Sequence, residues 1–185
     1  FEINSHKKDL AIILIDSVNV YKQDMTFEVA EQIILKAKEL ADKKAKKQEK
    51  ALAELTKGAI ITSSGLKYII LEKGEGDTPY PGQTVQVHYS GFFIDGTKFD
   101  SSYDKNKPLE FILGARRVIL GWEEAVQLLN VGAKAKLVIP PELGWGTRGA
   151  GKVIPPNATV IFEVELVEIV SQEHNHDHSD PNHTH

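Results

Sequence analysis

Five strand-like runs interrupted by a single helix constrain the fold of this 185-residue chain more than any other feature. Several runs alternate apolar and polar residues, which is typical of strands with one buried face. They are LKYIILEK (66–73), TVQVHYSGFF (84–93), PLEFIL (108–113), KAKLVIP (134–140) and ATVIFEVELVEIV (158–170). Residues 118–130 (VILGWEEAVQLLN) space their apolar side chains as on one helix face, and Gly132 provides a stop. The pattern predicts an α+β domain over residues 58–170, with an antiparallel sheet curled around a short helix.

The segment VIPPELGWGTRGAGKVIPPN (138–157) separates the last two strand-like runs and is unusually rich in special residues. It contains four prolines, four glycines and Trp145. A plain connection between two strands needs far fewer residues that fix or free the backbone. We therefore expect this loop to close over a site.

Residues 1–57 differ in composition from everything that follows, with eleven lysines, ten acidic residues and no arginine, proline or glycine. Apolar positions recur at helical spacing at Phe27, Ala30, Ile34, Ala37 and Ala41, and Leu52 and Leu55 continue the stripe. This pattern predicts a helical arm that dimerises through residues 27–55 or binds client chains. The lysine-rich run at 43–50 favours a solvated helix face over a nucleic-acid or membrane patch. Residues 9–21 are ambiguous between helix and strand, and helix is favoured weakly.

Composition excludes several classes of function. The chain has no cysteine, so disulfides, thiolate metal sites and a cysteine nucleophile are excluded. A net charge of −4 does not favour nucleic-acid binding. The longest apolar run, residues 10–15, is too short to span a bilayer as a helix. The first residue is Phe1, so we expect the start of the gene product to be missing, and the compartment, cytoplasmic or periplasmic, stays open.

The final residues, 171–185, carry five of the seven histidines and no core-forming residue, which predicts a disordered tail. His174, His176 and His178 alternate along the chain and could chelate a divalent cation. Adventitious metal affinity without a function is the favoured interpretation, and no cofactor is expected.

Three segments in order resemble the FKBP-type peptidyl-prolyl cis–trans isomerases. They are VQVHYSGFFIDGTKFDSSYDKNKPLEFILG (85–114), VILGWEEAVQLLNVG (118–132) and LVIPPELGWGTRGAGKVIPPNATVIFEVEL (137–166), which together cover most of 58–170. The resemblance implies an antiparallel half-barrel around the short helix, with an apolar pocket between sheet and helix. The pocket would accept proline-containing unfolded or flexible polypeptides, or a macrolide similar to FK506 or rapamycin.

The resemblance also assigns roles to residues of this pocket. Trp122 would form its floor and Asp100 its buried acid, while the Ile119 N–H would hold a carbonyl of the bound prolyl chain. Trp145 stands where the family commonly has a tyrosine, and Leu109 stands where an aromatic residue is frequent. The walls would come from Tyr89, Phe99, Phe111, Val118, Ile119, Ile154 and Phe162.

Two functions follow from this resemblance. The first is catalysis of X–Pro bond rotation in folding chains, with assistance from the helical arm. The second is a chaperone or binding module on the same scaffold with weak or no catalysis, because a fold alone does not define a function. The presence of the pocket residues favours the enzyme.

Overall fold

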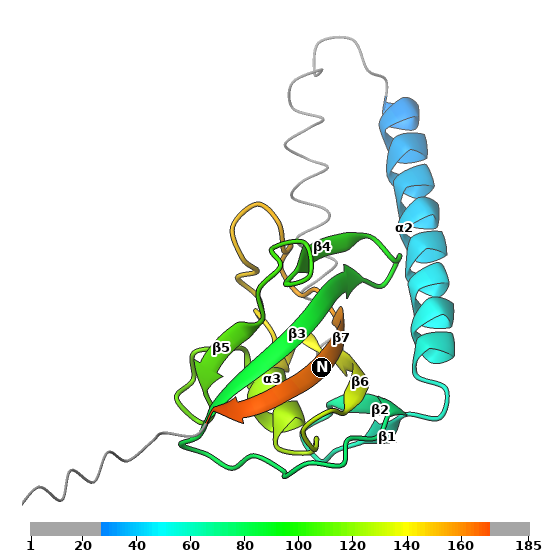
Figure 1. The fold of residues 1–185 in the computed structure, drawn as a ribbon. Helices are drawn as coiled ribbons and strands as arrows, with labels where there is room; N and C mark the ends of the chain where they lie inside the picture. The colour runs from blue at the N-terminus through cyan, green and yellow to red at the C-terminus, as the bar shows by residue number, and fades with distance from the viewer. Residues whose placement is uncertain (1–26, 171–185) are drawn as a thin grey trace, which may run out of the picture. The chain divides into compact units, whose positions relative to one another are not determined.

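The computed structural model of the chain describes residues 27–170 (Figure 1). The tail histidines and residues 9–21 lie outside the described residues. The chain divides into two compact units between Ala51 and Leu52, and each is treated by itself. In chain order the elements are α2 (Phe27–Leu55), β1 (Ile60–Ile61), β2 (Lys67–Glu72), β3 (Thr84–Phe93), β4 (Lys98–Ser101), β5 (Leu109–Ile112), α3 (Leu120–Val126), β6 (Lys134–Ile139), the short 3₁₀ helix η1 (Pro141–Leu143) and β7 (Val160–Val170).

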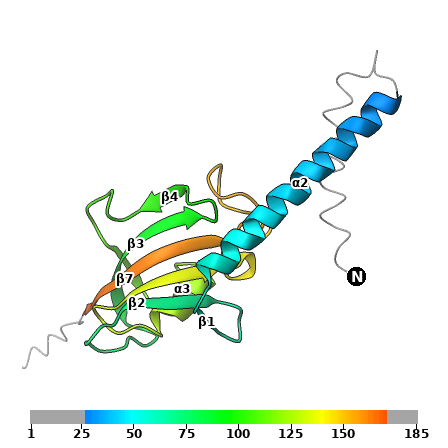
Figure 2. The ribbon, with the colours of Figure 1, turned by 90° about the vertical axis from the view of Figure 1, so that its right-hand side faces the viewer.

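The seven strands form one antiparallel sheet (Figures 1 and 2), in which six follow the order β1-β2-β6-β7-β3-β4 and the seventh, β5, pairs with β3. Strand β3 pairs with β7 along its whole length, from Thr84 opposite Val170 to Phe93 opposite Val160. On its other edge β3 pairs first with β5 and then with β4. The pairing with β4 shifts register after Gly91, and such irregularities bend a strand. The sheet therefore curves, as the sequence predicts.

The core lies between the concave face of this sheet and α3. Alternate residues of β3, namely Val85, Val87 and Tyr89, are buried, as expected for a strand with one face on the core. Trp122 and Val126 of α3 belong to the same buried cluster. Burying one such aliphatic or aromatic side chain stabilises a fold by about 1.5–3 kcal/mol. The expected α+β half-barrel around a short helix is confirmed.

Helix α3 is shorter than the periodicity of residues 118–130 predicts. Ile119 has an extended conformation (φ −63°, ψ 151°), and its carbonyl accepts the N–H groups of Trp122 and Glu123 as the helix begins. After Val126 the chain tightens, because the Leu128 and Leu129 N–H groups bond carbonyls only three residues back. Apolar spacing alone does not distinguish such turns from helix. The short strands β1 and β4 were not predicted either.

Helix α2 has 29 residues, which corresponds to a length of about 44 Å at 1.5 Å per residue. It confirms that the arm contains a helix, which spans Phe27–Leu55 within the predicted 1–57. Ile33, Ile34 and Leu40 are 41%, 51% and 69% exposed on it. Among residues 27–170, no helix is both long and apolar enough to cross a membrane.

Candidate active site

A cavity of about 760 Å³ opens between the sheet and the start of α3. Its apolar walls come from strands β3, β4 and β7, from the segment before α3, and from the loop between β6 and β7. The lining residues are Tyr89, Phe99, Asp100, Leu109, Arg116, Arg117, Val118, Ile119, Leu120, Trp122, Gly144, Trp145, Ala150, Val153, Ile154 and Phe162. An apolar cleft with few polar groups is the usual form of a small-molecule or peptide site.

Aromatic rings in edge-to-face contact build the base of the cavity. The Trp122 ring lies 5.1 Å from that of Tyr89 at 82°, and 5.3 Å from that of Phe162 at 89°. Phe99 meets Phe162 at 5.6 Å and 89°. Aromatic pairs prefer this geometry, and each adds about 0.5–1.5 kcal/mol beyond area burial. The four rings thus brace one another from three strands and one helix.

Gly91 of β3 makes this packing possible. A Cβ atom at this position would lie 2.7 Å from Phe99 Cζ and 2.8 Å from Phe162 Cε1. Both distances are shorter than real carbon contacts, so any side chain here would displace the rings. The rings can approach the strand because the residue is glycine.

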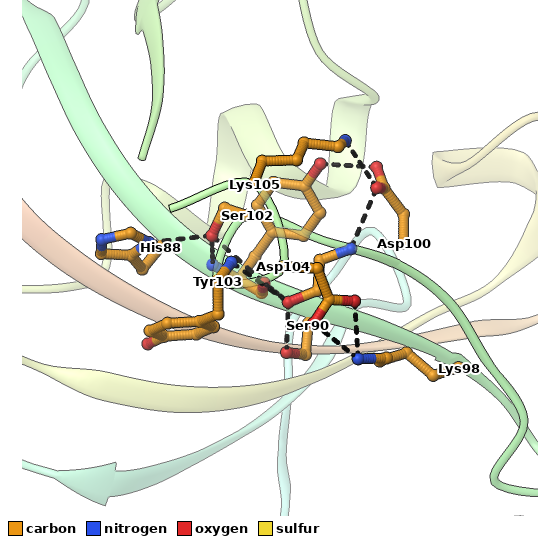
Figure 3. A network of polar contacts seen from close by, with 10 residues as sticks. His88, Ser90, Lys98, Asp100, Ser102, Tyr103, Asp104 and Lys105 are labelled. Atoms are coloured by element: carbon orange, nitrogen blue, oxygen red, sulfur yellow. Dashed lines mark hydrogen bonds and ion pairs between the residues drawn. The ribbon is translucent and has the colours of Figure 1, made fainter. Parts of the chain in front are cut away.

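Asp100 is the acidic residue of the cavity, and three donors hold it. Its Oδ2 accepts a hydrogen bond from the Tyr89 hydroxyl at 2.6 Å. Its Oδ1 accepts from Lys105 Nζ at 2.6 Å and from the Ser101 N–H at 2.9 Å. Figure 3 shows Lys105 reaching over to Asp100. The carboxylate is therefore fixed in orientation and its charge is paired.

These contacts shift the pKa values of both partners. Burial raises the pKa of Asp100, but the hydrogen bonds from Lys105, Tyr89 and Ser101 outweigh it, so the pKa lies below its ordinary value. Burial, together with the hydrogen bond to Asp100 and its charge, raises the pKa of Tyr89. At neutral pH Asp100 is ionised and Tyr89 keeps its hydroxyl proton.

A second polar group, which includes Ser102, His88 and Tyr103 (Figure 3), contacts the backbone of Tyr89. The buried Ser102 hydroxyl accepts the Tyr89 N–H at 2.8 Å and lies 2.9 Å from His88 Nδ1. The His88 ring stacks on Tyr103, with centroids 4.5 Å apart. Burial, the hydrogen bond to Glu165 and nearby carboxylates raise the pKa of Tyr103 to about 12. His88 thus contacts Ser102, which in turn binds the Tyr89 N–H, and His88 does not line the cavity.

Ile119 lines the cavity and carries a main-chain donor that is not used within the described part of the chain. Because its extended conformation precedes the helix, its carbonyl is used by Trp122 and Glu123. Within residues 27–170, its N–H donates to no other group. A free N–H on an apolar wall is well suited to bind a carbonyl oxygen.

The loop between β6 and β7 closes one side of the cavity, as the sequence predicts. It is ordered by its own hydrogen bonds: the Gly146 N–H donates to the Pro141 carbonyl at 2.9 Å, and Ala150 and Ile154 bond each other reciprocally. The loop contributes Gly144, Trp145, Ala150, Val153 and Ile154 to the lining. Gly149 has a φ of 65°, and a Cβ there would collide with the Ile154 carbonyl oxygen. The glycines therefore let the loop fold tightly on itself.

Of the ten residues expected in the pocket, the structure brings nine together in one cavity. Phe111 differs: it is 6% exposed and packs in the core, with its ring 6.1 Å from Trp122. Leu109 lines the wall where the family often has an aromatic residue. Arg116, Arg117, Leu120 and Lys105 were not anticipated, because their proximity depends on turns that hydrophobic patterns do not reveal. Within residues 27–170, no cluster of acidic and histidine residues could hold a metal ion.

Comparison with known proteins places this chain in one family. Residues 75–167 match the family described as FKBP-type peptidyl-prolyl cis-trans isomerase. FK506-binding protein 1 of Dictyostelium discoideum is 50% identical over 103 residues, which are 56% of this chain and 96% of that protein. The FKBP-type 22 kDa peptidyl-prolyl cis-trans isomerase of Escherichia coli is 50% identical over 113 residues, 61% of this chain and 54% of that protein. This chain therefore matches about half the length of the second relative.

A solved structure extends the similarity. The crystal structure of FkpA from Escherichia coli is 36% identical and superposes with a TM-score of 0.61. The match covers 88% of this chain and 81% of that one. It therefore reaches beyond the sheet domain into the helical arm.

Proposed function

The chain belongs to the FKBP-type peptidyl-prolyl cis–trans isomerases, and we propose that the cavity described above is where it accelerates rotation about X–Pro bonds. The single observation that carries this assignment is the convergence of Trp122, Phe162, Phe99, Asp100 and the free Ile119 N–H on one cavity. The proposed substrates are unfolded or flexible polypeptides that contain proline.

The chemistry requires neither a nucleophile nor a bond cleavage. Rotation about a peptide bond faces a barrier of about 18–20 kcal/mol that arises from conjugation of nitrogen with the carbonyl. X–Pro bonds isomerise unaided in roughly tens to hundreds of seconds. A catalyst needs only to bind the twisted amide more tightly than the planar one. The twisted amide is less polar because its resonance is interrupted, so an apolar aromatic cavity favours it.

The polar groups of the cavity position the chain during this rotation. The Ile119 N–H would bind one carbonyl beside the proline and hold that side of the bond still. Tyr89 is oriented by Asp100, and Asp100 by Lys105, so the hydroxyl is held near the cavity in a fixed geometry. Preorganised groups of this kind lose little further freedom when the transition state forms.

A protease-free exchange assay on an X–Pro peptide tests the assignment, with Asp100→Val and Phe99→Ala as variants. Each should lower kcat/KM about tenfold or more, equivalent to about 1.4 kcal/mol, while circular dichroism stays native. Asp104→Val is the matched control, because Asp104 also pairs with a lysine, Lys98, but does not line the cavity. Normal activity in both cavity variants would show that the site is elsewhere.

The helical arm supports a second role. We propose the division into an arm (1–57), an isomerase domain (58–170) and a tail (171–185), in which the arm holds client chains or a second copy. Exposed apolar side chains of α2, including Ile33, Ile34 and Leu40, favour this role. Refolding of a proline-limited protein, compared between the full chain and a chain beginning at Gly58, measures it. If deletion affects refolding but not peptide turnover, the arm recruits clients and the cavity catalyses.

A macrolide of the FK506 or rapamycin type is the proposed competing ligand. The cavity volume of about 760 Å³ and its aromatic base suit a large apolar ring system. The Dictyostelium discoideum relative is named for binding FK506. Trp145 in place of the tyrosine common in the family removes one hydroxyl contact, so we propose moderate affinity.

A further inference from the structure

Two arginines line the cavity without any partner in the described structure. Arg116 and Arg117 lie in the turn between β5 and α3, and both are exposed. Within residues 27–170, neither guanidinium makes an ion pair or a hydrogen bond. Arginine remains charged at every physiological pH. The wall of the cavity before Ile119 therefore carries two uncompensated positive charges.

No lining acid cancels these charges. The charged lining residues are Asp100, Arg116 and Arg117, and Asp100 is already paired with Lys105 at 2.6 Å. Glu123 of α3 is 8% exposed and accepts the Gly114 N–H at 2.6 Å. The cavity wall is thus positive although the whole chain has a net charge of −4. The local charge of the wall is therefore opposite in sign to the net charge of the chain.

The backbone of Arg116 provides an independent observation. Its φ is 55°, in the left-handed region that favours glycine. The other non-glycine residues with positive φ, Asn106 and Asn157, are of a type that tolerates this conformation. Arginine is not a residue type that tolerates this conformation. Residues held in such a conformation cluster at functional sites. Its long cationic side chain is the property that glycine or asparagine would not supply.

We propose that Arg116 and Arg117 select prolyl segments with a carboxylate side chain next to the proline. The inference rests on the proposed function of the cavity and adds the class of substrate. Arg116 and Arg117 precede Val118 and Ile119 directly in the chain and line the same cavity, so a polypeptide bound to the Ile119 N–H would lie beside them. Guanidinium groups bind carboxylates in a planar, bidentate geometry. Asp or Glu beside the proline should therefore be preferred over Asn or Gln at the same position.

The size of the preference follows from the exposure of the arginines. Exposed ion pairs contribute modestly and are screened by salt. We expect kcat/KM for a peptide with glutamate beside the proline to exceed that for its glutamine analogue by about two- to fivefold at low ionic strength. At high salt the ratio should approach one.

The experiment uses two peptide pairs and the full chain in a protease-free exchange assay. The two peptides of the first pair have Glu or Gln directly before the proline. The two peptides of the second pair have Glu or Gln directly after it. The ratio should exceed one in at least one pair for the natural protein. It should fall to about one in Arg116→Gln/Arg117→Gln and persist only in part in Arg116→Lys/Arg117→Lys, because lysine keeps the charge but not the bidentate geometry. Because each ratio is taken within one protein, a general loss of activity does not alter it.

The matched control is Arg148→Gln/Lys152→Gln, which removes two exposed charges from the β6–β7 loop without touching the lining. This variant should keep the full ratio of the glutamate to the glutamine peptide. A ratio of about one in this variant would mean that the preference comes from the overall charge of the protein and not from Arg116 and Arg117. A ratio of one in the natural protein with active turnover of the glutamine peptides overturns this inference alone. Absence of turnover of every peptide overturns the proposed function instead.

Discussion

The Tyr89 hydroxyl donates a hydrogen bond to Asp100 Oδ2 over 2.6 Å, from strand β3 to the neighbouring strand β4. The tyrosine ring lies on the aromatic base of the cavity, and the carboxylate holds its hydroxyl in place. Lys105 forms an ion pair with the other carboxylate oxygen of Asp100, so the three side chains are linked in a row. The orientation of a cavity hydroxyl thus depends on a lysine that lies outside the lining.

Replacing Lys105 by methionine should raise the pKa of Asp100. The hydrogen bond from Lys105 is the largest of the effects that lower this pKa. Without it, the effect of burial, which raises the pKa, would be less fully offset. Because the pKa is lower in the folded protein than its ordinary 3.8, the ionised carboxylate stabilises the fold above that pH. This contribution is lost as the pH falls through the folded pKa. Carboxyl chemical shifts of Asp100 measure both values.

The same substitution should cost little stability at neutral pH. The Lys105 and Asp100 side chains are 62% and 39% exposed, and exposed pairs contribute about 0.2–1 kcal/mol. The difference in unfolding free energy between natural protein and Lys105→Met should vanish at pH values below the folded pKa. A difference that stays constant with pH would contradict the pairing.

Gly91→Ala should disturb the cavity more than its small volume suggests. The new methyl group would collide with the rings of Phe99 and Phe162, which must then shift. Overpacking of this kind costs about 1–3 kcal/mol, and we expect kcat/KM to fall with it. Chemical denaturation and the exchange assay measure the two effects.

A compensating change separates the two consequences. Gly91→Ala/Phe99→Leu removes one of the colliding rings, so part of the stability should return while activity stays low. Recovery of activity in the double variant would mean that the Phe99 ring has no role in the reaction.

Strand β3 and helix α3 show what the sequence could predict and what it could not. Residues 84–89 alternate polar and apolar side chains, and the observed strand has the predicted bounds, 84–93, with every second residue buried from Val85 to Gly91. The helix was predicted too long at its start, since Val118 and Ile119 keep the apolar spacing but precede the helix, and Ile119 has an extended backbone. The Ile119 N–H, the polar group on which the proposed mechanism depends, lies where the helix begins, and backbone N–H groups there have no partner within the helix.

The residues of the site also fall into those that the sequence could predict and those that it could not. Tyr89, Phe99 and Trp122 could be placed because their motifs resemble those of a known family. Phe111 was expected on the wall, but its strand position turns it into the core behind Trp122. Arg116 could not be foreseen, because a left-handed arginine leaves no pattern in hydropathy.

Trp145→Tyr should tighten binding of FK506-like ligands. Tryptophan offers one N–H donor and no acceptor, whereas the tyrosine hydroxyl can do both. A neutral hydrogen bond contributes about 0.5–1.5 kcal/mol, roughly 2- to 13-fold in affinity. The Trp145 ring already lies 6.4 Å from those of Phe99 and Phe162, so a tyrosine fits in the same place. Calorimetry should give a lower Kd, and an unchanged or higher one would show that the loop position is misassigned.

The helical arm should make the full chain a dimer in solution. The 29-residue helix carries the predicted stripe of Phe27, Ala30, Ile34, Ala37 and Ala41. Ile34 of this stripe is exposed, as are Ile33 and Leu40, so a second copy can bury an apolar surface there. Light scattering at tens of micromolar should give twice the chain mass for the full chain and the monomer mass for a chain beginning at Gly58. Ile34→Glu should shift the full chain toward monomer, because a carboxylate would be buried in the interface. Lys38→Gln on the same helix is the control and should remain dimeric. A monomer mass for the natural full chain would mean that the stripe is covered by the rest of its own chain or reserved for clients.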